Sequence, residues 1–453
     1  MAIARRQVIS LLGWLTLSAA AGIVLRQKSS SSSAQVIVIG AGIAGLAAAQ
    51  LLKSQGIDAL VLEGRHRIGG RIWTDRSLGM PMDMGASWIH GPDGNNPITP
   101  LAHQARAQTF MTDENNLLYW DHRGNRVGEA QFAQDERAYE QLLEQIEKLA
   151  EQLPTDITIE QAIRRINPQQ LQNLAMQYRL TAYMEFDTGG PIEKLSARYW
   201  QADENFPGND VLFPAGYDAI TNRLSRGLNI KTNHIVRRIE YAEHRVRITT
   251  DQGDFTAARA LIALPLGVLK SGKVQFHPPL PDEMTRTLQK MAVGTVNKVA
   301  LLFPSLFWDE TTQYFGYEST VKGQYPYFLN ARTFSPTPAL ITFGLGNYGL
   351  TMEQQTDPQI VSDVMAHLRI MFGKHIPNPT QVLVSRWTSD PFAGGAYSYA
   401  AVGVTNDDFT KLGQTVAGTL FFAGEHTHAK YRATVHGAYL SGQRAAQQLL
   451  ASL

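Results

Sequence analysis

The sequence contains no cysteine among its 453 residues. This absence excludes disulfide bonds, thiolate metal sites, a catalytic thiol and a cofactor attached through a thioether. An excess of either charge is also missing, because 41 lysine and arginine residues balance 40 aspartate and glutamate residues. With a net charge of +1 and no basic cluster, the composition argues against a nucleic-acid-binding protein. The 44% hydrophobic and 18% charged content is ordinary for a globular protein, and the length suits two domains.

One largely apolar run stands out, at the N-terminus. The run Val8–Leu25 follows Arg5 and Arg6 and precedes the serine tract Ser29–Ser33. Twin arginines before such a run are similar to a twin-arginine export signal. At about 18 residues, the run is alternatively long enough for a short membrane anchor. We therefore predict that residues 1–33 are an export signal or membrane anchor plus a serine-rich linker, which puts the protein on the periplasmic, lumenal or extracellular side.

The rest of the chain is organised around residues 36–45, which read Val-Ile-Val-Ile-Gly-Ala-Gly-Ile-Ala-Gly. Four β-branched apolar residues are typical of a buried parallel strand, and a helical run rich in alanine and leucine follows. Gly40 permits a tight turn, Gly42 lets the backbone approach a pyrophosphate, and Gly45 lets the helix pack on the strand. The phosphates would rest at the helix N-terminus, where free N–H groups favour negative charge.

A second predicted strand, Ala59–Leu62, ends at Glu63, roughly 20 residues on, where an acid can bind a ribose hydroxyl. Arg65 and the Gly69–Arg71 segment follow. A nicotinamide-dependent dehydrogenase does not need this segment, whereas a flavoprotein that lays FAD along its surface does. The stretch resembles the FAD-binding signature of the flavin amine oxidase family, in which the Gly-Gly-Arg segment lies against the cofactor.

The resemblance runs from about residue 35 to the end of the chain, with the motifs in order. It implies an α/β fold in which a Rossmann-type FAD-binding domain is interleaved with an α+β substrate-binding domain. We assign residues 34–94, 212–275 and 400–453 to the FAD-binding domain, and residues 95–211 and 276–399 to the substrate-binding domain.

The resemblance also implies which residues bind FAD. The implied cofactor-binding residues are Gly40, Gly42, Ala44, Gly45, Glu63, Arg65, Gly70, Arg71, Gly85, Ala86, Ser87, Trp88, Val236, Trp387, Gly424, Glu425, Thr434 and Val435. They come from segments far apart in the chain. Convergence of such segments on one cofactor is hard to produce by chance.

Two polar residues are assigned to the reaction by the same resemblance. Residues 82–91, ending in Gly-Ala-Ser-Trp-Ile-His-Gly, are similar to a segment that runs beside the flavin in polyamine oxidases, and His90 falls where animal-type enzymes carry histidine. From the sequence alone, a histidine in a glycine-flanked turn is more often structural. Lys298 lies in the strand-like stretch Gly294–Phe303 and matches a lysine that holds a water at the flavin N5 edge.

The substrate side of the flavin is implied by two further segments. In monoamine oxidases a cysteine that anchors the flavin covalently precedes an aromatic residue facing the flavin. Here those positions are Ala396 and Tyr397, so the FAD is expected to be non-covalent. The second aromatic wall of monoamine oxidases is replaced by Thr434. A cage with one open side should admit a long or secondary amine more readily than a small benzylic one.

Helices are expected between the segment at residues 82–91 and the stretch that carries Lys298. Gln131–Gln152, Ile159–Ile166 and Pro168–Glu185 show helical spacing, the second introduced by Thr158 and the third by Asn167. Further on, the pattern predicts separate strands at 254–257 and 260–265. Four acidic residues gather near the end of the helices: Glu185, Asp187, Asp203 and Glu204. We interpret them as a solvated acidic rim, the alternative being attraction of a polycationic amine.

The sequence therefore predicts FAD-dependent oxidation of an amine, above all a polyamine such as spermine or spermidine, by the catalytic set Lys298, His90, Tyr397 and Thr434. The implied products are an imine, hydrolysed to an aldehyde and an amine, and hydrogen peroxide from O₂. An L-amino-acid oxidase, for which Arg332 could bind the carboxylate, and a monoamine oxidase remain alternatives. A non-catalytic FAD scaffold is disfavoured because the length leaves no room for an interaction arm. No metal is predicted, and the oligomeric state stays open.

Overall fold

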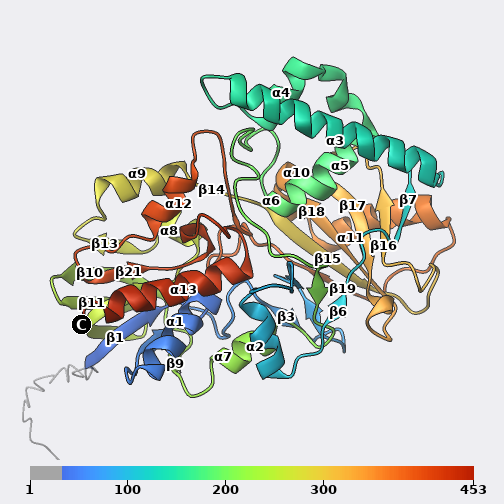
Figure 1. The fold of residues 1–453 in the computed structure, drawn as a ribbon. Coiled ribbons are helices and arrows are strands. Elements are labelled where there is room, and N and C mark those ends of the chain that lie inside the picture. Colours follow the sequence, from blue (N-terminus) through green and yellow to red (C-terminus); the bar gives the residue numbers. More distant parts are fainter. Residues whose placement is uncertain (1–32) are drawn as a thin grey trace, which may run out of the picture.

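A computed structural model describes residues 33–453 of the protein (Figure 1), so residues 1–32 of the predicted export signal or anchor lie outside the described part. Within the described residues, no helix combines the length and hydrophobicity needed to cross a membrane. The chain forms two lobes, each built on one large sheet, with the C-terminus near the start of β1 and β11 (Figure 1).

The first lobe contains an eight-stranded sheet in the order β13-β10-β11-β12-β1-β2-β9, with β21 also paired to β12. Strand β1 is parallel to both neighbours, with Ile37 opposite Leu60 on β2 and Ala260 on β12. The strands are β1 (Ser33–Ile39), β2 (Leu60–Leu62), β9 (Asn229–Lys231), β10 (Val236–Ala242), β11 (Arg245–Thr250), β12 (Gly253–Ile262), β13 (Gln275–His277) and β21 (Leu420–Phe422).

Residues 36–39 of β1 are buried on both faces of the sheet, as their uninterrupted apolar sequence predicts. Val36 and Val38 pack into the hydrophobic core shared with α1 (Ile43–Ser54) and α13 (Val435–Leu450), whereas Ile37 and Ile39 pack into a second core on the opposite face. Other helices of this lobe are α2 (Ile98–Ala105), α7 (Asp218–Leu224), α8 (Leu266–Lys270), α9 (Asp282–Lys290) and α12 (Asn406–Leu412).

Strand β12 corrects one sequence-based expectation. Residues 254–257 and 260–262 belong to one strand rather than two. The first half of β12 pairs antiparallel with β11, whereas its last three residues pair parallel with β21. A single strand therefore joins a hairpin to the parallel part of the sheet, which a local pattern does not reveal.

The second lobe contains a six-stranded sheet in the order β19-β15-β18-β17-β16-β7. Alternation along β15 sends Val299 and Leu301 into a core with α11 (Asp357–Phe372), and Val296 and Ala300 to the face turned toward the first lobe. Lys298 shares the alternation of Val296 and Ala300. The strands are β7 (Leu117–Trp120), β15 (Val296–Leu302), β16 (Tyr314–Tyr317), β17 (Gln324–Asn330), β18 (Ala339–Leu345) and β19 (Gln381–Val384), with α10 (Gly346–Glu353) following β18.

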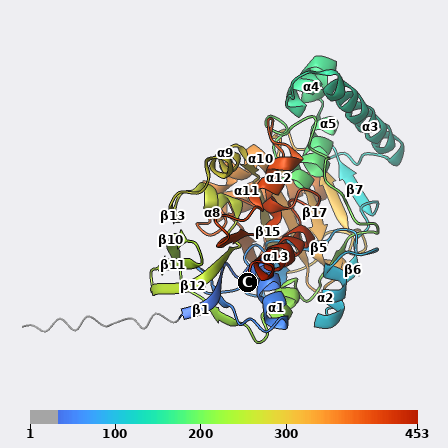
Figure 2. The same ribbon diagram turned by 60° about the vertical axis from the view of Figure 1, so that its left-hand side comes forward.

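A helical arm formed by α3 (Glu129–Gln152) and α4 (Ile159–Ile166) projects from the second lobe (Figures 1 and 2). The predicted start of α4 is confirmed, because Thr158 and Gln161 form a capping box. The predicted helix Pro168–Glu185 is wrong as a continuous element.

That segment breaks into a 3₁₀ turn at Pro168–Gln172, α5 (Leu174–Arg179), a π-helical turn at Leu180–Glu185 and α6 (Phe186–Thr188). Asn173 causes the first break, since its side chain accepts a hydrogen bond of 3.2 Å from the Met176 amide and restarts the helix.

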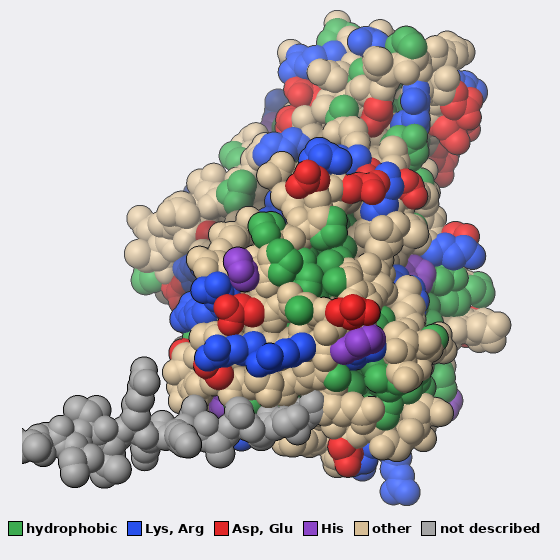
Figure 3. All heavy atoms as spheres, turned by 90° about the vertical axis from the view of Figure 1, so that its left-hand side faces the viewer, with side chains coloured by type: hydrophobic (Ala, Val, Ile, Leu, Met, Phe, Trp, Pro, Cys, Tyr) green, Lys and Arg blue, Asp and Glu red, His purple; other side chains and the backbone are tan. Residues whose placement is uncertain are grey.

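Small sheets join the lobes. A three-stranded sheet has the order β5-β8-β6, and two antiparallel two-stranded pairs are β3 with β4 and β14 with β20. Their bounds are β3 (Thr74–Asp75), β4 (Met82–Asp83), β5 (Trp88–Ile89), β6 (Phe110–Met111), β8 (Val211–Leu212), β14 (Ala292–Val293) and β20 (Ser398–Tyr399). On the face in Figure 3, acidic and basic side chains alternate around a hydrophobic patch.

The domain boundaries assigned from the sequence stay a prediction.

Candidate active site

A cavity of about 1660 Å³ lies between the lobes. It begins at the glycine turn after β1 and continues to the face of the second sheet that carries Lys298. Its walls come from segments spread along the whole described chain, from Ile39 to Ala438. The cavity is larger than the usual range of about 300–1,000 Å³ for a single small ligand. It has room for a cofactor and a substrate together.

The three glycines of the turn have different surroundings. Gly40 has a φ of +102°, and a Cβ atom there would lie 2.7 Å from the Ala263 carbonyl oxygen. A Cβ atom on Gly45 would lie 1.9 Å from the Gly40 carbonyl oxygen. A Cβ atom on Gly42 would meet no protein atom within 4 Å, and Gly42 lines the cavity. The chain itself requires Gly40 and Gly45, whereas Gly42 leaves open the space that a ligand would fill.

Glu63 lies opposite this turn at the end of β2. Its two carboxylate oxygens accept hydrogen bonds of 2.8 Å from the backbone N–H groups of Ala41 and Arg65. The side chain is thereby fixed at the cavity wall with lone pairs left for hydroxyl groups. No side chain caps the start of α1, whose first amides face the same region. A fixed carboxylate and an uncapped helix N-terminus suit a ribose and a pyrophosphate respectively.

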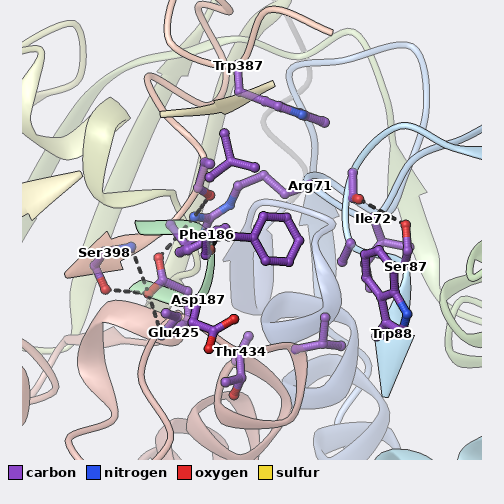
Figure 4. A pocket seen from close by; sticks show the side chains of 18 of the residues that line it. Arg71, Ile72, Ser87, Trp88, Phe186, Asp187, Trp387, Ser398, Glu425 and Thr434 are labelled. Carbon is purple, nitrogen blue, oxygen red and sulfur yellow. Dashed lines mark hydrogen bonds and ion pairs between the residues drawn. The ribbon is translucent and has the colours of Figure 1, made fainter. Parts of the chain in front are cut away.

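Arg71 and Glu425 connect the early and late parts of the chain across the cavity wall (Figure 4). Nη1 of Arg71 donates to Oε1 of Glu425 at 2.9 Å and to the Ala396 carbonyl at 2.7 Å. The other oxygen of Glu425 accepts from the Ser398 hydroxyl at 2.5 Å and the Ala433 amide at 3.1 Å. Burial alone would raise the pKa of Glu425, but the Arg71 charge and these hydrogen bonds lower it. Glu425 is therefore a fixed anion.

Lys298 is 6% exposed and reaches from β15 to the segment that follows β4. Its Nζ donates to the carbonyls of Asp83 at 2.8 Å and Gly85 at 2.7 Å, and to the Ser87 hydroxyl. Desolvation lowers the pKa of Lys298 to about 8, with the nearby Asp83 charge opposing the shift. As an ammonium, Lys298 uses its three hydrogens on protein oxygens. Its predicted water-holding role stays a prediction.

Tyr397 and Thr434 both line the cavity, but their polar groups bond to the protein. The Tyr397 hydroxyl donates to the Phe186 carbonyl, and Gly189 leaves room for the ring, since a Cβ atom there would lie 2.7 Å from it. Thr434 caps α13: its hydroxyl accepts from the Gly437 amide at 2.9 Å and donates to the Tyr431 carbonyl at 2.8 Å.

Aromatic rings from the second lobe complete this part of the cavity, and the sequence analysis missed them. Phe186 packs edge to face against Phe343 at 4.9 Å and against Tyr327 at 5.5 Å between ring centroids. All three line the cavity. In Figure 4 the Phe186 ring projects into the space between Glu425 and Trp88. The apolar spacing around these residues predicts buried secondary structure. It does not indicate that one face of that structure borders a cavity.

His90 forms a pair with Asp210, with 2.5 Å between Nδ1 and Oδ2. The His90 side chain is 49% exposed and borders the cavity. Desolvation lowers the pKa of His90, but the hydrogen bond and charge of Asp210, with smaller effects of Asp187 and Glu114, raise it overall. Asp210 therefore favours the protonated form of His90. Asp210 lies in a loop without a motif, so no sequence signal pointed to it.

The predicted solvated acidic rim is wrong for Glu185, which is buried, and its four members lie in different environments. Glu185 is 1% exposed and pairs with Lys322 at 2.8 Å. Asp203, beside the cavity, pairs with the buried Arg432 at 2.9 Å. Glu204 is exposed and pairs with Lys430, and Asp187 lines the cavity.

Among the described residues, Asp187 and Glu114, which we call the carboxylate wall, are two acidic side chains of the cavity lining without a polar partner, as is Glu129. Within residues 33–453, neither carboxylate has a hydrogen bond or an ion pair with another side chain, and both line the cavity. Desolvation raises the pKa of Asp187 to about 7, with Glu114 adding to the shift and His90 opposing it. Desolvation and the charge of Asp210 likewise raise the pKa of Glu114. Two mutually repelling carboxylates favour a bound cation.

Comparison with known proteins identifies the family. The family model of flavin containing amine oxidoreductases matches residues 43–450. The chain belongs to this family. It is 35% identical over 439 residues to polyamine oxidase 2 of Arabidopsis thaliana, covering 93% of this chain and 89% of that protein.

Two other similarities are informative. The amine oxidase is 35% identical over 437 residues to lysine-specific histone demethylase 1 homolog 2 of Oryza sativa subsp. japonica, covering 92% of this chain but 57% of that protein. The solved structure of wild-type putrescine oxidase bound to putrescine superposes with a TM-score of 0.76 at 21% identity, covering 92% of this chain and 99% of that one. The predicted FAD-binding fold is thereby confirmed.

The amine oxidase binds FAD, and the residues present fit that cofactor. Gly42 leaves space at the uncapped start of α1, and Glu63 presents fixed oxygens beside it. Of the predicted cofactor residues, Gly45 alone is absent from the cavity lining, since it lies beneath the turn against Gly40. Arg65 borders the cavity, but its guanidinium is bound to Asp390 in two hydrogen bonds of 2.8 and 3.0 Å.

The other predicted cofactor residues all border the cavity. They are Gly40, Gly42, Ala44, Glu63, Gly70, Arg71, Gly85, Ala86, Ser87, Trp88, Val236, Trp387, Gly424, Glu425, Thr434 and Val435. Their individual contacts with FAD stay predictions. With no cysteine in the chain and alanine at position 396, the FAD cannot be attached through a thioether, and its non-covalent binding stays a prediction. The described residues contain no group of three or more potential metal ligands.

Proposed function

We propose that this amine oxidase acts on a polyamine such as spermine or spermidine, converting it to an imine that water hydrolyses to an aldehyde and an amine. Bound FAD would supply the acceptor for the hydride equivalent of the carbon beside the amine nitrogen, and O₂ would be the final electron acceptor, giving hydrogen peroxide. The protein must align the C–H bond of that carbon with the flavin and exclude water from the reacting atoms.

The unpaired carboxylates of Asp187 and Glu114 carry this proposal. The nitrogen that reacts must be neutral, so it does not call for an anionic partner. A polyamine has further nitrogens, which remain protonated near neutral pH. Carboxylates in the same cavity would hold such an ammonium while the reacting nitrogen lies elsewhere. A monoamine would leave both carboxylates without a cationic partner.

The rest of the wall suits an extended chain. Tyr397 supplies one aromatic wall, and the threonine at position 434 leaves the opposite side open. Phe186 and Tyr327 continue the apolar lining toward Asp187. Methylene segments between the nitrogens would pack on these rings, and a protonated nitrogen would also be attracted to their faces.

Two groups would handle protons. His90, held by Asp210, could accept a proton from the ammonium form of the substrate so that the nitrogen reacts as a neutral amine. Lys298, buried beneath Gly85 and Ser87, would act at the flavin edge through a water or by fixing this strand. Neither group needs to form a covalent bond with the substrate.

The L-amino-acid oxidase alternative has less support. Such an enzyme needs a cation for the substrate carboxylate, and Arg332 was the candidate. Arg332 pairs with Glu310 at 3.2 Å and is absent from the cavity lining. Asp187 and Glu114 would repel an α-carboxylate by the same Coulomb interaction that attracts an ammonium.

We further propose that the twin-arginine segment exports the protein, or anchors it at the membrane, after FAD has been bound. Arg5 and Arg6 before the apolar run support this proposal. Replacing both arginines with lysine should keep the protein in the cytoplasmic fraction. Unchanged fractionation would contradict the twin-arginine route.

A substrate panel tests the proposed activity. Purified protein is assayed for peroxide with spermine, spermidine, putrescine, tyramine and L-amino acids at equal concentration. We expect the highest kcat/KM with spermine or spermidine. Peroxide formed with tyramine or with amino acids alone would replace the polyamine assignment by one of the two alternatives.

A further inference from the structure

A buried ion cluster lies directly behind the carboxylate wall. Nζ of Lys322 contacts Oε1 of Glu185 at 2.8 Å and Oε1 of Glu193 at 2.5 Å. Oε1 of Glu185 also accepts a hydrogen bond of 2.8 Å from the Ile192 amide. Glu185 is 1% exposed, so its charge depends on the single cation that reaches it.

Glu185 occupies a special position in the chain. It is the last residue of the π-helical turn Leu180–Glu185, and Phe186 and Asp187 follow at once. A π-turn contains one residue more than an α-turn, so the side chains after it are rotated by about 100° relative to an uninterrupted α-helix. The π-turn therefore decides whether Asp187 faces the cavity.

Lys322 reaches Glu185 from the other side of the lobe. It lies in the turn between β16 and β17, and the start of β17 is irregular. The pairing of β17 with β18 shifts between Gln324 and Phe328, and Tyr325, which is fully buried, has a φ of +46°. A non-glycine residue with this φ is held against a backbone preference. The turn carrying Lys322 is thus firmly placed by the sheet.

We propose that Lys322 is a positioning residue for substrate binding: its ion pair with Glu185 keeps the π-turn in register, so that Asp187 faces the cavity. This inference rests on the proposed function, because Asp187 is taken to bind an ammonium group of the substrate. Without Lys322, Glu185 is a buried carboxylate with no cation, and the turn can relax toward an α-helical register.

The kinetic test compares two substrates that differ in one charge. Spermidine is set against N-butyl-1,3-diaminopropane, in which hydrogen replaces one terminal amino group. In Lys322→Met we expect the KM for spermidine to rise about tenfold, with kcat nearly unchanged and with little change in KM for the analogue. A general loss of structure would instead impair both substrates alike. Lys322→Arg should restore the spermidine KM.

A matched control and a double variant sharpen this test. Lys194 is adjacent to Glu193 but exposed, and Lys194→Met should leave both KM values unchanged. In the double variant Lys322→Met/Asp187→Asn, the KM for spermidine should be no higher than in Asp187→Asn alone. If the KM increases of the two single substitutions multiplied in the double variant, Lys322 would not act through Asp187.

A second measurement does not depend on the reaction. Hydrogen–deuterium exchange over residues 180–192 should speed up in Lys322→Met and stay unchanged in Lys322→Arg and Lys194→Met. If Lys322→Met does not fold, Glu185→Gln, which keeps the acceptor for Ile192, should show the same change in smaller measure. Unchanged exchange in these variants overturns this inference even if spermidine is the substrate, whereas lack of polyamine oxidation by the unmodified protein counts against the proposed function.

Discussion

The glycine turn and the carboxylate wall bound the same cavity but are built in different ways. The turn is formed by residues close in sequence, Gly40 to Glu63, and its contacts are to backbone atoms. The wall takes Glu114 and Asp187 from separate segments, and its character depends on which acidic side chains find a basic partner. The glycine turn is therefore predictable from the local sequence, whereas the carboxylate wall exists only in the folded chain.

The largest effects are expected from substituting two glycines, one required for folding and the other for cofactor binding. Gly45→Ala places a Cβ atom 1.9 Å from a backbone oxygen and should lower the free energy of unfolding by about 3 kcal/mol. Gly42→Ala meets no protein atom and should leave the stability of the FAD-free protein unchanged. It should nevertheless weaken FAD binding about 100-fold, because the Cβ atom enters the space of the cofactor.

Thermal unfolding of the FAD-free variants and FAD titration measure these two effects separately. Equal destabilisation by both substitutions would contradict the distinction, as would normal FAD affinity in Gly42→Ala.

The next largest effect is expected at Lys298, which reaches from the second sheet to the segment at residues 83–87. Lys298→Met should retain FAD but slow turnover about 100-fold. The reason is that the ammonium contacting Asp83, Gly85 and Ser87 is lost beside the flavin edge. Stopped-flow measurement of flavin reduction and reoxidation would show which step slows. Unchanged kinetics would remove the role assigned to this lysine.

The carboxylate wall should affect substrate affinity rather than the cofactor. Asp187→Asn and Glu114→Gln should each raise the KM for spermidine about tenfold while leaving FAD content unchanged, since each removes an unpaired anion from the cavity. Glu204→Gln is a suitable control, because Glu204 is an exposed residue paired with Lys430. Equal effects of all three substitutions would mean that general surface charge, not this wall, attracts the substrate.

A smaller effect is expected from pH. The pKa of Asp187 is raised to about 7, so the side chain loses its negative charge as the pH falls through this value. The KM for spermidine should therefore rise on acidification from about pH 8 to 6. His90 and the substrate also titrate, so the profile of Asp187→Asn serves as the reference. Identical profiles for the two proteins would show that Asp187 does not act through its charge.

The same contrast explains how much the sequence could predict. The strand–glycine–helix pattern, the place of Glu63 directly after a buried strand and the helix start at Thr158 are local, and the structure has each of these elements where expected. The segment Pro168–Glu185 was predicted as one helix because helical spacing hides the break at Asn173 and the π-turn. Glu185 and Asp187 are two residues apart, yet one is buried against Lys322 and the other faces the cavity.

Asp210 and Phe186 illustrate why the rest of the site stayed hidden. Asp210 acquires its role by meeting His90 across 120 residues of chain. Phe186 borders the cavity because the π-turn presents it there. Neither residue belongs to a motif, and periodicity distinguishes buried from exposed positions but not a packed core from a cavity wall.

Anaerobic mixing of the purified FAD-bound protein with substrate most directly tests the claim that one cavity holds a dissociable flavin beside an ammonium-binding wall. We predict that spermidine or spermine bleaches the flavin, that the bleaching needs a higher polyamine concentration in Asp187→Asn, and that acid precipitation then releases the cofactor into solution. Bleaching by L-amino acids but not by polyamines, or equal concentration dependence in both proteins, would contradict that claim.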